Sequence, residues 1–262
     1  MCTLIALHRV RPGAALVVAA NRDEFFERPA EGPALRGGRV VAPLDVRAGG
    51  SWLGINRTGV FAAVTNVSCT EPEPERRSRG LLVMDALAAP SAKQAAEMLE
   101  ALPTRAFNPF NFFVADARDA FAFTYEDEIR AVGSDDGAWV IGNAPLDAPT
   151  PPKLARLRDR LGDLTASDAN LLDDLAEVCR NHEPGPRGPL DAVCVHTGPY
   201  GTRSSCLLQL ADAGLEDSRS ILRWSEGAPC RNDYQDISPL LRDLGRGRPA
   251  WKESEQERGR AT

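Results

Sequence analysis

The sequence lacks any apolar run long enough to cross a bilayer as a helix. The longest early apolar stretch, residues 14–20, ends at the polar tetrad N-R-D-E, whereas a spanning helix needs about 20 apolar residues. A secretory signal is missing too, because the apolar run at 4–7 is short and no basic segment precedes it. We therefore expect a cytoplasmic protein whose mature chain starts close to Met1.

An excess of basic charge is also absent. The chain carries 31 Lys and Arg against 37 Asp and Glu, a formal net charge of -6. Nucleic-acid-binding surfaces are normally strongly basic, so we predict no nucleic-acid partner. The sequence contains no P-loop, no G-x-G-x-x-G and no Ser-His-Asp arrangement, which removes the commonest motifs for nucleotide binding and serine hydrolysis.

Metal-binding cysteine pairs are missing as well. The six cysteines form no C-x-x-C pair and no histidine stands at ligand spacing from them in the sequence, so we predict no metal site. Isolated cysteines usually behave as small buried hydrophobes, and Cys194 and Cys206 lie in strand-like runs that fit this role. His8 and His196 also lie in such runs and are expected to be structural. Cys2 differs because of its place in the chain.

What is present is an ordinary globular composition, 43% hydrophobic and 26% charged, with enough apolar residues for a sizeable core. Apolar runs predict strands at 3–10 and 14–21, joined by a hairpin turn at Pro12-Gly13. Further strands are predicted at 51–56, 60–66, 111–115, 120–125, 139–141, 192–196 and 204–210, the last two joined by the turn G-P-Y-G.

Helical apolar spacing occurs in three segments. Residues 79–102 predict two helices, with Ser91 as the cap of the second, and further helices are predicted at 152–161 and 167–181, the latter capped by Ser167. Clustered strands with separate helix pairs indicate an α+β layered fold, with helices on the faces of largely antiparallel sheets. We expect one domain over 1–244 and a charged, disordered tail over 245–262.

Cys2 is the first candidate for chemistry. Initiator methionine is generally removed before a small second residue, and the mature chain would then begin with a cysteine that carries its own α-amine. An α-amine with a pKa of about 7.7–8.0 can act as a base near neutral pH, and a thiol near 8.5 needs only a modest push to become a thiolate. The alternative is that Cys2 simply begins an edge strand.

The tetrad N-R-D-E at 21–24 is the second candidate. It could be a solvated turn, but the predicted hairpin returns it to the neighbourhood of Cys2. There Asp23 could orient the terminal amine, and Arg22 could lower the pKa of the thiol or hold a substrate carboxylate.

Two asparagines at strand ends, Asn66 and Asn143, are candidate oxyanion donors, although turn formation is the commoner role of such residues. Arg203, which follows a glycine turn, could bind an anion or face solvent. The three histidines offer no general base that the pattern favours.

The motifs together resemble the NRDE family, also called the transport-and-Golgi-organisation protein 2 family. They are the initial Met-Cys, A-A-N-R-D-E-F at 19–25, G-G-S-W-L-G-I at 49–55, A-A-V-T-N at 62–66, F-N-P-F-N at 107–111, G-N at 142–143 and Y-G-T-R-S-S at 200–205. They span the chain from Met1 to about Trp224. The family is similar, more distantly, to N-terminal-nucleophile hydrolases of the penicillin V acylase and bile-salt hydrolase type.

This resemblance implies a four-layer αββα fold. It matches Cys2 to the nucleophile, Asp23 to the aspartate that orients the amine, and Asn66 and Asn143 to the oxyanion-region asparagines. Candidate substrate contacts are drawn from the motifs: Asn21, Arg22, Glu24, Trp52 and Arg203.

Two functions follow as hypotheses. In the first, the chain hydrolyses an amide or an acyl-CoA-like thioester with Cys2 as nucleophile and needs no cofactor. In the second, the same pocket carries haem, acyl-CoA or another lipid without turnover, in keeping with the family's association with haem trafficking, lipid metabolism and the secretory pathway. A third reading, an interaction scaffold with a degenerate pocket, also remains open.

Overall fold

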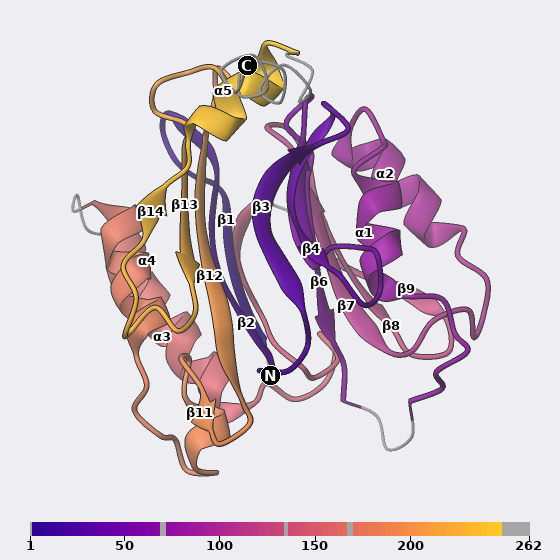
Figure 1. Ribbon diagram of the computed structural model, residues 1–262, viewed down its shortest axis with the longest axis vertical. Coiled ribbons are helices and arrows are strands. Elements are labelled where there is room, and N and C mark those ends of the chain that lie inside the picture. Colours follow the sequence, from indigo (N-terminus) through magenta and orange to yellow (C-terminus); the bar gives the residue numbers. More distant parts are fainter. Residues whose placement is uncertain (1, 69–71, 134–135, 167–169, 248–262) are drawn as a thin grey trace, which may run out of the picture.

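The computed structural model describes residues 2–68, 72–133, 136–166 and 170–247. In these residues two antiparallel β-sheets stack face to face, and a pair of helices covers the outer side of each (Figure 1). The architecture is therefore the predicted four-layer αββα sandwich of the α+β class. Within the same residues, no helix is both long and apolar enough to cross a membrane.

The first sheet contains seven strands in the described residues and has the order β10-β1-β2-β12-β13-β14, with β11 paired to β12. Its strands are β1 (Thr3–Arg11), β2 (Ala14–Phe25), β10 (Gly137–Ile141), β11 (His196–Thr197), β12 (Tyr200–Ala211), β13 (Ile221–Glu226) and β14 (Gln235–Asp236).

The second sheet also contains seven described strands, and these follow one another in chain order. They are β3 (Ala30–Arg36), β4 (Val40–Asp45), β5 (Leu53–Asn56), β6 (Phe61–Asn66), β7 (Phe110–Ala115), β8 (Ala120–Tyr125) and β9 (Ile129–Gly133).

Three apolar clusters separate the four layers. Leu4, Val18 and Phe113 belong to the cluster between the sheets. The second sheet packs on α1 (Arg79–Ala86) and α2 (Ala92–Glu100). The first sheet packs on α3 (Pro152–Ala166) and α4 (Leu171–Arg180). A short 3-10 turn, Pro189–Asp191, and α5 (Pro239–Gly245) complete the described elements.

Strand alternation decides which neighbours the N-R-D-E tetrad meets. In β2, Val18 and Ala20 lie in the core between the sheets, whereas Val17 and Ala19 lie in the core beneath α3 and α4. Because neighbouring side chains in a strand point to opposite faces, the same alternation turns Arg22 toward the space between the sheets. Asn21 and Asp23 point toward the helices.

The hairpin of β1 and β2 is confirmed, with Thr3 opposite Asn21, and so is Ser91 as the cap of α2, whose hydroxyl accepts from the Gln94 N–H. One strand prediction is wrong. Residues 192–194 are bends and Val195 is irregular, and within this segment only His196–Thr197 pairs with β12. There the backbone is anchored by individual hydrogen bonds instead of a ladder.

Several predicted boundaries shift or fall outside the described residues. Helix α4 begins at Leu171 after Asn170, and the expected cap Ser167 lies outside the described residues, as does the predicted tail beyond Gly247. The pattern missed strands β3, β4, β9, β13 and β14 and helix α5. Strands β3, β9 and β13 are partly exposed and β14 is exposed, so no long apolar run marks them, and the short apolar run of β4 is interrupted at Pro43.

Candidate active site

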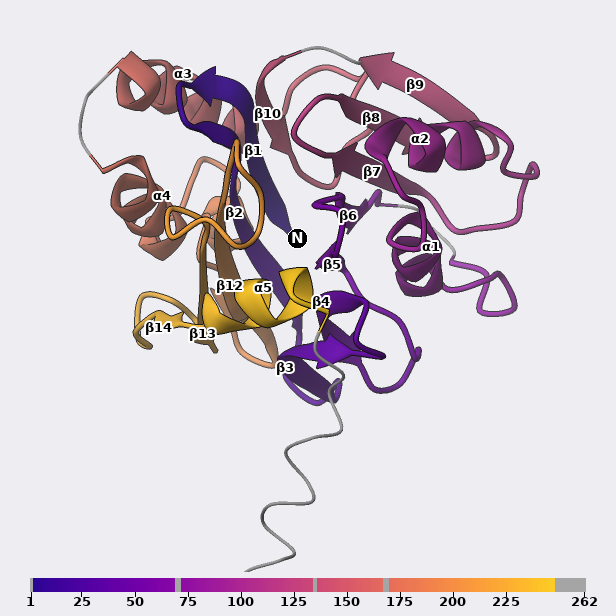
Figure 2. The same cartoon turned by 90° about the horizontal axis from the view of Figure 1, so that it is seen from above.

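Strand β1 begins at one end of the sandwich (Figure 1), beside β2 and next to β5 and β6 of the other sheet (Figure 2). Cys2, which precedes β1, shares a cavity with Val64 and Asn66 of β6. Its thiol is 3.8 Å from the backbone carbonyl oxygen of Asp23, which accepts a weak hydrogen bond from it. The half-buried side chain lines two cavities at once, one of about 300 Å³ and one of about 430 Å³. A ligand could therefore reach the sulfur from either side.

The smaller cavity has a mainly apolar wall with positive charge at its border. Pro145, Pro151 and Leu154 supply apolar surface, and Lys153 and Arg187 supply the charge. The larger cavity is polar and is lined by three residues of the tetrad, Arg22, Asp23 and Glu24, by Trp52 and by several arginines. Cys2 thus separates an apolar compartment from a charged one.

Asp23 is almost fully buried on the helix-facing side of β2. Its Oδ1 accepts a hydrogen bond of 2.6 Å from the Thr202 hydroxyl of the paired strand β12. Burial raises the pKa of this carboxyl, while the charge on Lys153 and the hydrogen bond from Thr202 act in the opposite direction. The carboxylate is therefore held in a fixed position next to the start of the chain.

Lys153 belongs to this site although the sequence analysis did not single it out. Its side chain is only 4% exposed, and no hydrogen-bond acceptor for its Nζ is found among the described residues. Burial lowers its pKa, and the nearby Asp23 and Cys2 counteract that shift. The signal in the sequence was its position four residues before Leu157, which places a lysine on the apolar face of α3.

Arg22 takes the opposite face of β2 and points between the sheets. Its guanidinium stacks on the Trp52 ring at 4.3 Å from the ring centroid, and its Nη2 is 3.7 Å from Asp45 and 3.8 Å from Glu24. Arg22, Glu24 and Trp52 all line the larger cavity with Cys2. These three predicted substrate contacts are therefore placed where they can meet a ligand.

Asn66 and Asn143 approach Cys2 from different cavities. Asn143 lines the smaller one and Asn66 the larger one. The Asn143 side-chain amide donates a 2.5 Å hydrogen bond to the Asn66 backbone carbonyl, which joins the end of β6 to the segment after β10. Among the described residues the second N–H of the Asn143 amide has no partner, and the oxyanion role of both residues stays a prediction.

Asn21 and Arg203 have other partners than expected. The amide of the buried Asn21 donates to the carbonyls of Cys179 and Val193, at 2.9 and 3.0 Å. Arg203 donates from Nη1 to three backbone carbonyls at the end of β2 and in the loop after it, the closest being that of Phe26 at 2.7 Å. Neither residue lines a cavity that contains Cys2, so both hold the backbone around the site.

The electrostatic state of Cys2 depends on burial. Burial raises the pKa of the thiol, the carboxylate of Asp23 acts in the same direction, and the Arg22 guanidinium opposes both. A protonated thiol is a weak nucleophile. Chemistry at Cys2 therefore requires a base close to the sulfur.

Two further features escaped the sequence analysis. Thr202, inside the quoted Y-G-T-R-S-S motif, holds Asp23, and strand pairing alone would have placed it there. The spacing of cysteines and histidines along the sequence also gave no sign of a cluster that forms in three dimensions. Cys194, His196 and Cys230 lie together, with all their ligand atoms within 4.8 Å of one another.

The two stacked sheets with helices on their outer faces define the class of fold, which is that of N-terminal-nucleophile hydrolases. Solved structures confirm the fold. The chain is similar to a conjugated bile acid hydrolase from Clostridium perfringens, with 12% identity, a TM-score of 0.53, and coverage of 92% of this chain and 94% of that one. It is also similar to the Caenorhabditis elegans ortholog of N-acylethanolamine-hydrolyzing acid amidase, with 10% identity, a TM-score of 0.52, and coverage of 79% and 92%.

The chain belongs to the Transport and Golgi organisation 2 family, whose model matches residues 1–216. It is 29% identical over 230 residues to the Transport and Golgi organization 2 homolog of Mus musculus, which covers 76% of this chain and 82% of the mouse protein.

Proposed function

We propose that this protein is a cysteine N-terminal-nucleophile hydrolase that cleaves an amide or a thioester, with acyl-CoA-like thioesters as a candidate substrate class. The observation that carries the proposal is the place of Cys2, which lies at the junction of an apolar and a charged cavity and contacts the backbone carbonyl of Asp23, a residue whose carboxyl group is buried. The reaction requires removal of Met1, which gives Cys2 a free α-amine.

In the first half-reaction the α-amine takes the thiol proton, and the sulfur forms a bond to the carbonyl carbon of the substrate. Asp23 orients the resulting ammonium, and the amides of Asn143 and Asn66 donate hydrogen bonds to the oxyanion. As the bond to the leaving amine or thiol breaks, the ammonium returns the proton to it. Water then hydrolyses the acyl-cysteine with the same amine as base, which regenerates the thiol and releases an acid.

The two cavities support a division of the substrate. An acyl chain fits the cavity formed by Pro145, Pro151 and Leu154. An anionic leaving group fits the other cavity, where Arg22 lies against the Trp52 ring. A substrate with an apolar acyl part and a charged remainder would thus place its carbonyl at the sulfur.

The alternative is a carrier of haem, acyl-CoA or another lipid that does not react with its ligand. The raised pKa of the Cys2 thiol favours it, as does the smaller cavity, whose apolar wall and basic border suit a molecule with an apolar body and carboxylates. In that case Cys2 would contact or ligate the cargo without forming an acyl intermediate.

Intact-mass analysis of the natively expressed protein, with and without a thiol-reactive acyl probe, tests the proposal directly. We expect loss of Met1 and one acyl adduct, located on Cys2. The Cys2→Ala variant should lose the adduct and all turnover on a panel of amides and thioesters. The matched control is Cys206→Ala, which removes a buried thiol elsewhere in the same sheet and should retain both.

Binding measurements on the same preparations separate the two functions. Lost turnover with retained acyl-CoA and haem affinity in Cys2→Ala supports the hydrolase. Quantitative retention of Met1 would contradict the mechanism. A wild-type protein without turnover that binds haem or acyl-CoA at micromolar affinity or better, about -8 kcal/mol, would establish the carrier instead.

A further inference from the structure

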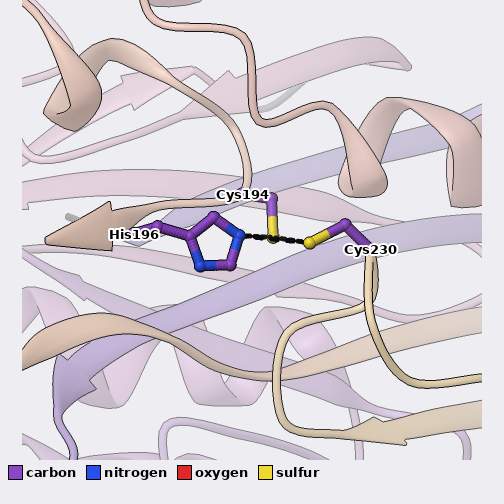
Figure 3. Close-up of side chains that lie close together, drawn as sticks. All are labelled: Cys194, His196 and Cys230. Atoms are coloured by element: carbon purple, nitrogen blue, oxygen red, sulfur yellow. Dashed lines mark hydrogen bonds between the residues drawn. The ribbon is translucent and has the colours of Figure 1, made fainter. Parts of the chain in front are cut away.

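A second constellation of reactive side chains lies outside the cavities that contain Cys2. Cys194 and His196 stand two residues apart just before β12, and Cys230 comes from the loop between β13 and β14 (Figure 3). In an extended segment, residues two apart point to the same side. Both side chains therefore face the loop that carries Cys230.

The distances within this cluster are those of ligands around one metal ion. The sulfurs of Cys194 and Cys230 are 3.6 Å apart, and the Nε2 of His196 is 3.1 Å from one sulfur and 3.7 Å from the other. A tetrahedral zinc with bonds of about 2.3 Å to sulfur and about 2.0–2.1 Å to nitrogen separates two sulfurs by about 3.8 Å and a sulfur from a nitrogen by about 3.6 Å. Shifts of a few tenths of an ångström would complete three corners of a tetrahedron.

A disulfide fits these positions less well. It would require the sulfurs of Cys194 and Cys230 to approach to about 2.05 Å, far closer than the observed 3.6 Å. It would also leave the imidazole of His196 without a role, although its nitrogen lies within contact distance of both sulfurs. Two thiols and an imidazole around one centre are a ligand set that zinc prefers.

His182 is within reach of the fourth corner. Its ring centroid is 6.0 Å from that of His196, and its exposed side chain can rotate. The backbone brings it there, because the Cys194 N–H donates to the Asn181 carbonyl at 2.8 Å. A rotation of the His182 ring toward the cluster would complete a Cys2His2 set.

We propose that Cys194, His196 and Cys230 bind a structural zinc ion, with His182 as the fourth ligand. Each thiol releases its proton to solvent as its sulfur binds, so the site gains one dication and loses two protons. The ion would cross-link two loops that lie 34 to 36 residues apart in the chain. The cross-link lowers the entropy of the unfolded chain relative to the folded one.

The zinc site would support the proposed active site without touching it. Val195, which lies between Cys194 and His196, donates its N–H to the Thr202 hydroxyl at 2.8 Å. The same hydroxyl holds Asp23. Residues 192–195 form no strand ladder of their own, so the ion would fix the segment that holds Thr202. This proposal does not depend on whether Cys2 is a nucleophile.

The test uses the full chain, free of any affinity tag and kept under reducing, anaerobic conditions. After addition of zinc and removal of the excess, elemental analysis should find one zinc per chain. Cys194→Ala, His196→Ala and Cys230→Ala should lose it, and the matched variant Cys206→Ala should retain it. Circular dichroism identifies any variant that fails to fold. We expect Cys230→Ala to fold most readily of the three, because Cys230 lies half-buried in a loop.

Cobalt bound in place of zinc reports the type and the geometry of the ligands through its absorption spectrum. We expect a thiolate-to-cobalt charge-transfer band and intense visible bands of a tetrahedral site, absent in Cys230→Ala. His182→Ala should weaken zinc binding by about tenfold or more without abolishing it. A wild-type protein without stoichiometric zinc and without the cobalt bands would overturn the proposal. So would a zinc content in the three ligand variants that equals the zinc content of the wild type.

Discussion

Replacement of Thr202 by valine should destabilise the protein strongly, although the two side chains have nearly the same shape. The Thr202 hydroxyl donates to Asp23 and accepts from the Val195 N–H, and all of these groups are buried. Valine can make neither hydrogen bond. Since the volume is conserved, no cavity forms, and the loss is due to the two unpaired partners alone.

The expected magnitude follows from those two partners. A hydrogen bond to a charged group contributes about 1.5–3 kcal/mol, and a stranded buried N–H costs about 1–3 kcal/mol. Partial relaxation of residues 192–195 reduces the sum, so we expect the free energy of unfolding to fall by about 3 kcal/mol. With a urea slope of about 3 kcal/mol per molar, the unfolding midpoint would shift by about 1 M.

The pH dependence gives an independent check. Burial raises the pKa of Asp23 in the folded protein above the unfolded value of about 3.9. The folded chain thus binds the proton more tightly. The stabilisation that comes from protonated Asp23 is fully present below about pH 4 and is lost as the pH rises through the folded-state pKa. The hydrogen bond from Thr202 lowers that folded-state pKa, so its removal in Thr202→Val should make the loss between pH 4 and pH 7 larger.

Urea unfolding of wild type, Thr202→Val and Thr202→Ser at pH 4 and at pH 7 measures these quantities. The same metal chelator is present in every sample, so that bound metal does not contribute to the differences. Thr202→Ser keeps the hydroxyl and should cost about 1 kcal/mol or less, since only a methyl is lost. The reasoning is refuted if Thr202→Val stays within about 0.5 kcal/mol of wild type, or if the serine variant is as destabilised as the valine variant.

Three further predictions concern buried hydrogen bonds and one close backbone contact. Asn56→Ala should cost about 3 kcal/mol in urea unfolding, because its amide donates to two carbonyls after α1 and its Oδ1 accepts three hydrogen bonds in the β5–β6 turn; a cost below about 1 kcal/mol would contradict it. Gly201→Ala should lower the melting temperature, because its Cβ would lie 2.6 Å from the Val195 carbonyl oxygen, and an unchanged value would show that the backbone yields freely. Asp191→Asn should destabilise the protein by about 1–2 kcal/mol at pH 7. Hydrogen bonds from Arg187 lower the pKa of Asp191, so this stabilisation is present above the unfolded pKa and is lost as the pH falls through the folded one; a constant difference down to pH 2 would count against it.

Much of the architecture could be predicted because its signals are local. The hairpin of β1 and β2 follows from two apolar runs around Pro12-Gly13, and the Ser91 cap follows from one hydroxyl before an amphipathic helix. Residues 192–195 were mistaken for a strand, because an apolar run has the same composition whether it pairs in a ladder or is held by single hydrogen bonds from Asn21 and Thr202.

Some residues of the candidate site could also be predicted from local signals, and others could not. Cys2 and Asp23 could be found from the start of the chain, the tetrad and the resemblance, since the hairpin alone places them near each other. The hydrogen-bond partners of Asn21 and Arg203 could not be predicted from the sequence. They depend on which face of β2 meets α4 and on where the loop after β2 turns back. Lys153 was missed because its relation to Asp23 crosses two layers.

The sequence by itself determined the class of fold, the hairpin and the position of a cysteine at the start of the first strand. These depend on periodicity and on neighbours within one turn or one hairpin. Only the tertiary structure decided that Cys2 separates two cavities, that Thr202 and Lys153 flank Asp23, and that Cys194, His196 and Cys230 meet. Such contacts join residues many positions apart, and the packing of the layers that creates them leaves no periodic trace along the chain.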